Sequence, residues 1–361
     1  MTPGVAAARP LYVSDGDASP WLSRWLFAVA ALVVAMVAVG GATRLTDSGL
    51  SIPEWKPLLG AIPPLNASDW SDAFAKYRAI PEYKLVNDGM SLAEFKNIYW
   101  WEWGHRFLGR FIGLAYGLPL IAFWLAGRIP RGLRLPLLGV LALGALQGFV
   151  GWYMVQSGLT ERVDVSHYRL AMHLGLAFII LGGLIWLALA AQPGDPLARL
   201  QSVARPACRI AVILAVLILL QVIFGAFVAG TKAGLTYNTW PLMDGNLIPS
   251  GLLEKSPWYL NVTENLTTIQ FNHRAMAYIL VALAAIQACT IALQTDNTRV
   301  IASARVLAAL MLAQATLGIW TLLAVDGAIP IHLGIAHQTV AAVVFAVAVW
   351  HLHTTWTAVR E

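Results

Sequence analysis

The sequence predicts an all-α membrane protein whose eight transmembrane helices form two tandem four-helix bundles. Hydrophobic residues make up 58% of the 361 residues and charged residues only 12%, with a mean hydropathy of +0.66. Soluble domains of this length do not have such a composition. The chain also repeats itself, because His105 and His173 return as His273 and His337 after 168 and 164 positions. One duplication therefore covers the whole chain.

The predicted helices are the apolar runs that are long enough to cross a bilayer, which takes about 20 residues at a rise of about 1.5 Å each. Four of them fall in each half of the chain. They cover residues 21–41, 105–126, 133–155, 167–191, 210–230, 271–293, 300–324 and 332–355.

These helices divide the chain into two similar units, which we expect to be related by a pseudo-two-fold axis along the membrane normal. The first unit includes a long loop at 42–104, which is longer than a bundle connection needs and is therefore a functional candidate. The predicted parts are a cytoplasmic tail at 1–20, an N-terminal bundle at 21–191, a cytoplasmic linker at 192–209 and a C-terminal bundle at 210–356.

Basic residues predict the orientation in the membrane. Arginines gather in the three short loops at 127–132, 192–209 and 294–299 and at the helix starts beside them. Cytoplasmic loops carry an excess of Lys and Arg, so these loops and both termini are expected in the cytoplasm, with the segments 42–104 and 231–270 in the periplasm. The first 20 residues lack the features of a transit peptide or a cleaved secretory signal. We therefore predict a multi-pass protein of the bacterial inner membrane.

Charge and cysteine content exclude other classes of protein. The net charge of +5 comes from lysines and arginines beside apolar segments, where they set orientation, so we assign no nucleic-acid partner. The two cysteines, Cys208 and Cys289, have no near partner. Neither a disulfide framework nor a cysteine metal site is therefore expected.

The four repeated histidines, His105, His173, His273 and His337, are predicted in the first two turns of helices that enter from the periplasmic side. Each half then presents two imidazoles at one level. Any single intramembrane histidine can be a polar residue that bonds a neighbouring helix, but ionisable residues at membrane depth are costly and tend to be functional. Histidine pairs without nearby cysteine or carboxylate fit haem iron better than structural zinc.

Three arginines near these histidines are candidates for binding haem propionates, which require cations. Arg106 and Arg274 follow His105 and His273 directly, and Arg169 lies about one helical turn before His173. The alternative is that each is an interfacial arginine whose charged end reaches the headgroups. The remaining membrane histidines are predicted to be interfacial, namely His167, His332, His351 and His353.

The two long loops differ at one position that bears on chemistry. GLSIPEWKP at 49–57 aligns with GLTYNTWP at 234–241 through Gly-Leu and a tryptophan, and the residue before the tryptophan is Glu54 in the first loop and Thr239 in the second. A carboxylate kept in one copy of a duplicated site indicates that this copy does chemistry while the other holds a cofactor. The alternative is a solvated loop acid.

Several motifs in fixed order make this chain resemble the haem A synthase family, in the form shared by proteobacteria and mitochondria. The resemblance covers nearly the whole chain, from about Gly41 to the last helix. The motifs are GATRLTDSGLSIPEW, EWGHRFLGR, AMHLGLA, TYNTWPLMDG, FNHRAMAY and GIAHQTVA.

This resemblance implies a membrane oxidoreductase that converts haem O to haem A for cytochrome c oxidase biogenesis. Two successive hydroxylations of the porphyrin C8 methyl group would lead to a gem-diol, which loses water to leave a formyl group. The resemblance also implies a haem b ligated by His273 and His337, with His105 and His173 flanking the substrate haem. Glu54 matches the essential loop glutamate of the family. Some bacterial members have a cysteine pair in the first periplasmic loop that is missing here, so thiol-based electron delivery is not expected.

The implied partners are haem O as substrate, haem O synthase (protoporphyrin farnesyltransferase) as its donor, membrane lipid and a homo-oligomeric copy. Two other functions remain open. A bis-histidine membrane cytochrome b that only transfers electrons would carry similar sites, but it has no need of Glu54 in one half alone. A transporter built from repeats is the third, although its repeats are more often inverted.

Overall fold

The computed structural model describes residues 20–56, 59–160, 162–192 and 203–359. Within these ranges the regular secondary structure is helical, apart from isolated β-bridges. Eight helices are long and apolar enough to cross a membrane, which confirms the predicted fold class. They are α1 (Pro20–Leu45), α4 (Leu92–Leu125), α5 (Arg131–Gln156), α6 (His167–Ala190), α7 (Arg205–Thr231), α9 (Leu266–Gln294), α10 (Thr298–Leu323) and α11 (Ile331–Thr357).

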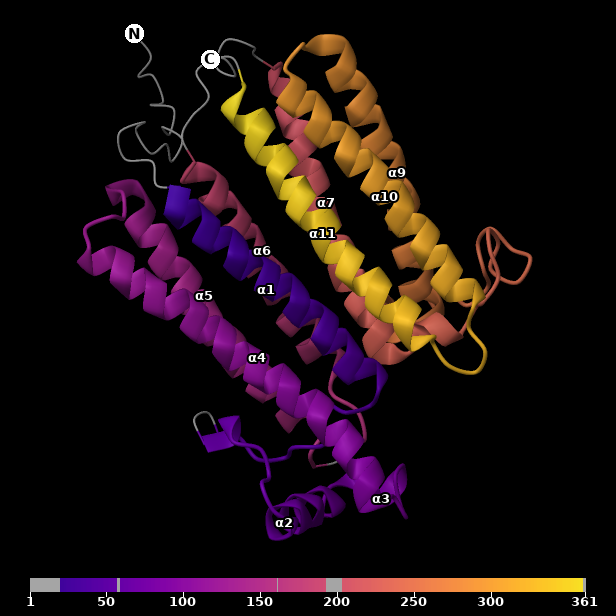
Figure 1. The fold of residues 1–361 in the computed structure, drawn as a ribbon. Coiled ribbons are helices and arrows are strands. Elements are labelled where there is room, and N and C mark those ends of the chain that lie inside the picture. The colour runs from indigo at the N-terminus through magenta and orange to yellow at the C-terminus, as the bar shows by residue number, and fades with distance from the viewer. Residues whose placement is uncertain (1–19, 57–58, 161, 193–202, 360–361) are drawn as a thin grey trace.

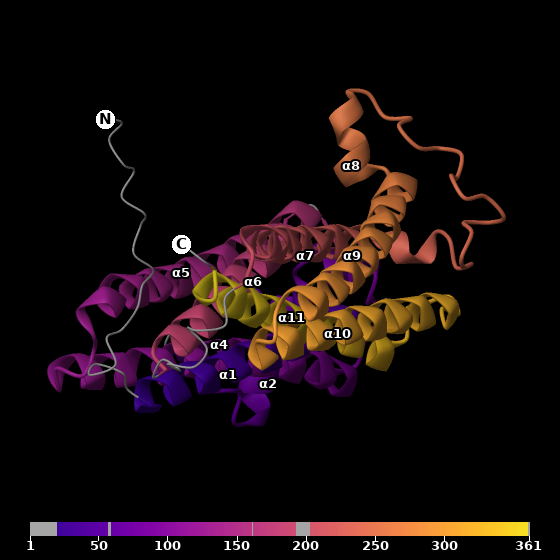
Figure 2. The same cartoon turned by 90° about the horizontal axis from the view of Figure 1, so that it is seen from above.

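The remaining helices lie in the two long connections. The connection from α1 to α4 contains α2 (Ala67–Arg78) and α3 (Pro81–Leu85), and the connection from α7 to α9 contains α8 (Asn261–Glu264). Figure 1 shows both connections at one end of the bundle, while α1 begins and α11 finishes at the opposite end. In Figure 2 the second connection projects to one side of the bundle with α8. The predicted tail, up to residue 19, and linker residues 193–202 lie outside the described residues.

Helix contacts follow the order expected of a duplicated chain. In the first half α1 packs on α4 and α6, and α5 packs on α4 and α6; in the second half α7 packs on α9 and α11, and α10 packs on α9 and α11. Between the halves, α1 packs on α11 and α6 packs on α7, while α6 also meets α11. If each helix is replaced by its counterpart in the other half, every contact in this set corresponds to a contact that is also in the set. The arrangement is compatible with two tandem bundles, whose axis and limits remain predictions.

The start of α4 differs from the prediction. The helix begins at Leu92 because Ser91 and Glu94 form a capping box, which satisfies two helix-end groups that lack partners. His105 therefore lies more than three turns into the helix, so its predicted place in the first two turns is wrong. The other three histidines lie nearer to their helix starts, since His173 and His337 are the seventh residues of α6 and α11 and His273 is the eighth of α9.

Aromatic side chains hold the first connection onto the extra turns of α4. Tyr77 and Phe74 of α2 stack on Phe95 of α4 at centroid distances of 5.2 and 5.0 Å, and Trp70 meets Tyr99 at 5.0 Å. These rings form a small apolar core of their own. The α2–α3 segment is therefore a packed cap over one end of the first half rather than an extended loop.

The far end of the second half holds a buried polar network around His351. This side chain has no exposed surface, and its interfacial position along the membrane stays a prediction. Its Nδ1 lies 2.9 Å from Ser303 Oγ, and its Nε2 lies 3.1 Å from Gln287 Nε2. Gln287 in turn donates to the Ala207 carbonyl at 2.8 Å. The network ties α7, α9, α10 and α11 together, because each polar group in a membrane interior needs a partner.

Candidate functional site

Two of the repeated histidines face each other in the second half. The ring centres of His273 on α9 and His337 on α11 are 6.4 Å apart, and their planes meet at 78°. Each ring lies against a glycine of the next helix. A Cβ atom at Gly225 of α7 would lie 3.2 Å from His273 Cε1, and one at Gly318 of α10 would lie 2.8 Å from His337 Cε1. A side chain at either position would therefore crowd the imidazole, and more so at Gly318 than at Gly225.

The first half repeats this arrangement. A Cβ atom at Gly40 of α1 would lie 2.9 Å from His105 Cε1, and one at Gly151 of α5 would lie 3.0 Å from His173 Cε1. All four histidines thus rest on a glycine of a neighbouring helix, in the same relation in both halves. The sequence already indicates this, because Gln147 and Gly151 return as Gln314 and Gly318, each after 167 positions.

Three glutamines hold the backbone at the histidines. Gln147 Nε2 donates to the His173 carbonyl at 3.1 Å, Gln314 Nε2 to the His337 carbonyl at 2.9 Å and Gln221 Nε2 to the His273 carbonyl at 2.9 Å. The side chains of Gln147 and Gln314 also approach the ring nitrogens of His173 and His337. Such contacts orient metal-ligating imidazoles in proteins.

The donor set and the spacing in the second half fit a haem. Two metal–nitrogen bonds of about 2 Å each, with about 1 Å from each nitrogen to its ring centre, come to about 6 Å, close to the 6.4 Å observed. In the described part of the chain, no three His, Cys, Asp or Glu side chains gather to hold a bare metal ion. A porphyrin-bound iron needs only two axial ligands from the protein, which the imidazole pair supplies.

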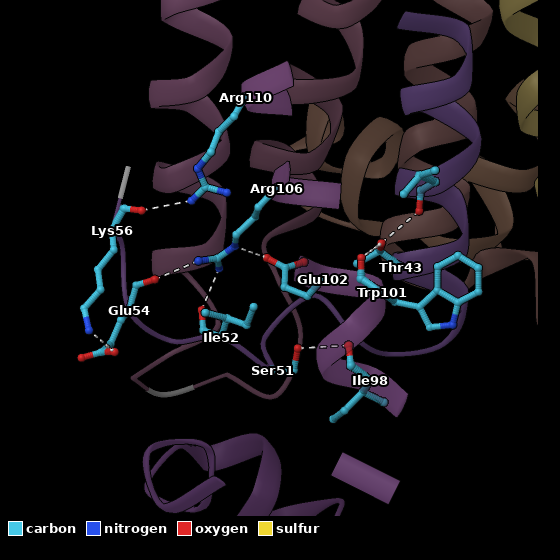
Figure 3. A network of polar contacts seen from close by, with 11 residues as sticks. Thr43, Ser51, Ile52, Glu54, Lys56, Ile98, Trp101, Glu102, Arg106 and Arg110 are labelled. Carbon is cyan, nitrogen blue, oxygen red and sulfur yellow. Dashed lines mark hydrogen bonds and ion pairs between the residues drawn. The ribbon is translucent and has the colours of Figure 1, made fainter. Parts of the chain in front are cut away.

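The arginines beside the first histidine of each half fasten the long connections to the helices. Arg106 donates to the carbonyl oxygens of Glu54 and Ile52 at 2.8 and 2.7 Å (Figure 3). Arg274 donates to those of Thr239 and Tyr237 at 2.9 and 2.8 Å. These carbonyls occupy aligned positions in GLSIPEWKP and GLTYNTWP. Each half therefore has the same guanidinium clamp on its loop backbone.

The third candidate arginine lies in the first half only. Arg169 on α6 places its guanidinium 3.6 Å from the ring centre of Tyr153, and it donates to the Tyr153 carbonyl at 2.6 Å. All three arginines predicted to bind propionates thus contact protein carbonyls. A role toward propionates remains a prediction for each.

Glu54 lies in the first connection with its backbone and its carboxylate turned in different directions (Figure 3). The carboxylate accepts hydrogen bonds from Lys76 at 2.9 Å and Lys56 at 3.0 Å, and the side chain is 43% exposed. The hydrogen bond from Lys76, followed by that from Lys56, lowers the pKa of the Glu54 carboxyl below its ordinary value. Glu54 is therefore an ionised group at the surface of the connection.

A second carboxylate, which the sequence prediction missed, lies deeper in the first half. Glu102 on α4 is buried, with 4% of its surface exposed, and its Oε1 accepts a hydrogen bond from Arg106 Nε at 2.5 Å. It precedes His105 by three residues. At the matching offset of 168, α9 carries Gln270, which donates to the Tyr237 carbonyl at 2.9 Å. The alignment of EWGHR with QFNHR already contains this difference.

Comparison with known proteins identifies the family. A family model described as cytochrome oxidase assembly protein (COX15-CtaA) matches residues 23–349. The chain is 54% identical over 331 residues to a heme A synthase of Parvibaculum lavamentivorans, covering 91% of this chain and 92% of the relative. It is 52% identical over 356 residues to a heme A synthase of Methylobacterium sp. (strain 4-46), covering 96% and 97%. This chain belongs to the haem A synthase family.

Membership confirms the family predicted from the motifs, and a heme A synthase of Agrobacterium fabrum, 49% identical over 328 residues, points the same way. It also confirms haem-related chemistry in a membrane protein. The roles of individual residues do not follow from a family name. They depend on the geometry of the two histidine sites and on the differences between them.

Proposed function

We propose that this protein is a membrane-embedded haem A synthase that oxidises the C8 methyl group of haem O to a formyl group by two successive hydroxylations, for cytochrome c oxidase biogenesis. The observation that carries the proposal is the pair of matched histidine sites, of which the first has Glu54 and Glu102 at positions where the second has Thr239 and Gln270. Relatives that cover more than nine-tenths of the chain are named heme A synthase, which supports this function.

The second half is proposed to hold a resident haem b, with His273 and His337 as axial ligands. Their ring spacing of 6.4 Å fits such ligation. At the positions of the two carboxylates of the first half, this half has Thr239 and Gln270. When bound, the haem supplies a one-electron redox centre. The protein holds the imidazoles against Gly225 and Gly318 and has neither of the two carboxylates of the first half at the matching positions.

The first half is proposed to bind haem O between His105 and His173. The guanidinium of Arg106 already bonds Glu102 and the loop carbonyl of Glu54. A carboxylate of the substrate haem would compete with these two partners. A carboxylate near the methyl group can stabilise positive charge that develops at its carbon or accept a proton from attacking water. Glu54 is proposed for this role because Thr239 replaces it in the other half. Glu102 is a second candidate, because it is buried close to His105 and is replaced by Gln270.

The orientation in the membrane follows from the arginine-rich loops. We place the two long connections in the periplasm and both termini in the cytoplasm of a bacterial cell, with bundles at 21–191 and 210–356. Haem O then enters near the α2–α3 cap, with haem O synthase as its donor. A homo-oligomeric copy is a further proposed partner.

Haem analysis of purified variants tests this function. Pyridine haemochrome spectra and chromatography of extracted haems should show haem b with traces of haem O or A in the wild type. A bis-histidine cytochrome b, the alternative function, would contain haem b alone, and cells that depend on it would not convert haem O. Absence of conversion in cells that carry the intact gene would overturn the proposal.

A further inference from the structure

Two consecutive glycines of α1 lie between the two histidine sites. Gly40 faces the first site, since a Cβ atom there would lie 2.9 Å from His105 Cε1. Gly41 faces the second half, since a Cβ atom there would lie 3.0 Å from Gln338 Oε1. Each glycine in a helix interior costs about 1 kcal/mol relative to alanine. Close approach from both sides gives a reason for having two in a row.

Gln338 joins the halves at this point. It follows His337 directly on α11, and its Nε2 donates to the Val37 carbonyl of α1 at 3.0 Å. Val37 and Gly41 are four residues apart, so they lie on the same face of α1, about one turn from each other. A short path of contacts therefore runs from His337 to Gln338, across one turn of α1 and on to His105.

The corresponding place in the other interface between the halves is apolar. The residue after His173 is Leu174, and the residue after Gly225 is Ala226. These positions match Gln338 and Gly41 in the duplicated chain. Where α6 meets α7, a Cβ atom at Gly175 would find its nearest neighbour at 3.7 Å, an ordinary contact with Ile223. The polar link thus exists in only one of the two related interfaces.

A side-chain amide between membrane helices is stable only when it is hydrogen-bonded. With its Nε2 bonded to α1, the Gln338 side chain holds the start of α11 at one position along α1. A merely apolar contact, as at Leu174, would allow the two helices to slide by small amounts. The hydrogen bond specifies a register between the segment that carries His337 and the segment that supports His105.

We propose that Gln338 is a positioning residue that couples the two histidine sites, by fixing His337 against the turn of α1 on which His105 rests. This inference rests on the proposed function, because it takes a haem b at His273 and His337 as given. A disturbance at His105 then reaches the haem b through the Gln338–Val37 hydrogen bond. The coupling is energetic and can be measured as non-additivity in a mutant cycle.

The test is a double-mutant cycle on the full-length purified protein, read by redox titration of the resident haem b. G40A crowds His105, and Q338L removes the hydrogen bond at nearly constant volume. We expect each change to alter the haem b reduction equilibrium about two- to thirtyfold, the range over which residues between two sites modulate their coupling. In the double variant, G40A should add nothing to the effect of Q338L. G175A, in the related interface, serves as the matched control and should leave the equilibrium unchanged.

Additive effects of G40A and Q338L, or no effect of G40A on the haem b, would overturn the inference. If Q338L fails to accumulate, G41A makes the same test from the α1 side, because its methyl group displaces the Gln338 amide. Failure of the proposed function is recognised separately. It would appear as an unchanged haem b spectrum in variants that lack His273 or His337, before any cycle is measured.

Discussion

The two halves share one scaffold for holding imidazoles and differ in the acids placed beside it. In both, each histidine rests on a glycine, and an arginine clamps the loop backbone at aligned carbonyls. Only the first half has Glu54 and Glu102, where the second has Thr239 and Gln270. In the first half the α2–α3 segment packs over the histidine helix and forms an apolar core with it, whereas the second connection has the four-residue helix α8 on α9. The features that both halves share are those proposed to bind a haem. The acids and the α2–α3 cap of the first half indicate where the proposed chemistry takes place.

The largest expected effect comes from the ligands of the second half. H273A or H337A should remove the low-spin haem b spectrum while the protein still inserts, because each iron axial ligand is a single imidazole. Absorption spectra of the purified variants measure this. H332A is the matched control, since His332 lies on the same helix as His337 but is exposed. Retention of an unchanged bis-histidine spectrum in both variants would show that the haem b lies elsewhere.

The proposed catalytic carboxylate, Glu54, gives the next largest effect. E54Q keeps size and hydrogen bonding but removes the charge, so haem A production should fall about 10²- to 10³-fold, as when one preorganised group at a reacting centre is lost. The haem b should stay bound, and chromatography should show haem O or the singly hydroxylated intermediate. T239E should not create a second active site. Normal haem A levels in E54Q would make Glu54 a solvated loop acid.

The buried carboxylate allows the same comparison at a different depth. E102Q deprives Arg106 of its charged partner and should also lower haem A production about 10²- to 10³-fold. Q270E, the reciprocal change in α9, should create no activity. Comparing E102Q with E54Q under the same expression conditions shows which acid acts at the methyl group. If E102Q were fully active, Glu102 would be a structural partner of Arg106 and not the acid that acts at the methyl group.

Substitutions of Arg106 and Arg274 should have smaller effects, and these effects should differ between the two halves. R106K and R274K keep the charge but lose the two-pronged donation to the loop carbonyls, which planar guanidinium groups favour. R106K should lower turnover several-fold with haem b intact, whereas R274K should weaken haem b retention with less effect on the substrate site. Product analysis together with haem content per chain measures both. Equal effects of the two changes on haem b would contradict the division of roles.

The smallest expected effect is a pH dependence of the cap. Glu82 of α3 is buried, and burial, followed by repulsion from Asp47 and Asp164, raises the pKa of its carboxyl to about 8. The folded state therefore holds this proton more tightly than the unfolded state. The resulting stabilisation is complete below the ordinary pKa of about 4.5 and is lost as the pH rises through about 8.

E82Q cannot ionise, so it should reduce the loss of thermal stability between pH 6 and pH 9 by a few degrees. Thermal unfolding in detergent at the two pH values measures this difference. D88N, at an exposed acid three residues beyond the end of α3, is the control and should behave as the wild type. An identical pH dependence in E82Q and the wild type would show that Glu82 is not protonated in the fold.

Sequence alone predicted the eight spans, which the structure confirms, and it predicted the duplication and the four histidine positions, because apolar length and repeat offsets can be read directly from the order of residues. It also showed that Glu54 of the first loop aligns with Thr239 of the second. The capping signal at Ser91 and Glu94 was present in the sequence as well, but the search for apolar runs placed the start of α4 at His105. Local signals thus predicted the elements better than their ends.

Tertiary structure decided what the side chains do. Whether Arg106 binds a ligand or a loop carbonyl, whether His351 faces the interface or a buried serine, and whether Gly41 meets Gln338 all depend on which helices become neighbours. A residue type has several partners available to it, and packing selects one. The sequence determined which groups enter the membrane, and the contacts between helices determined which of them meet.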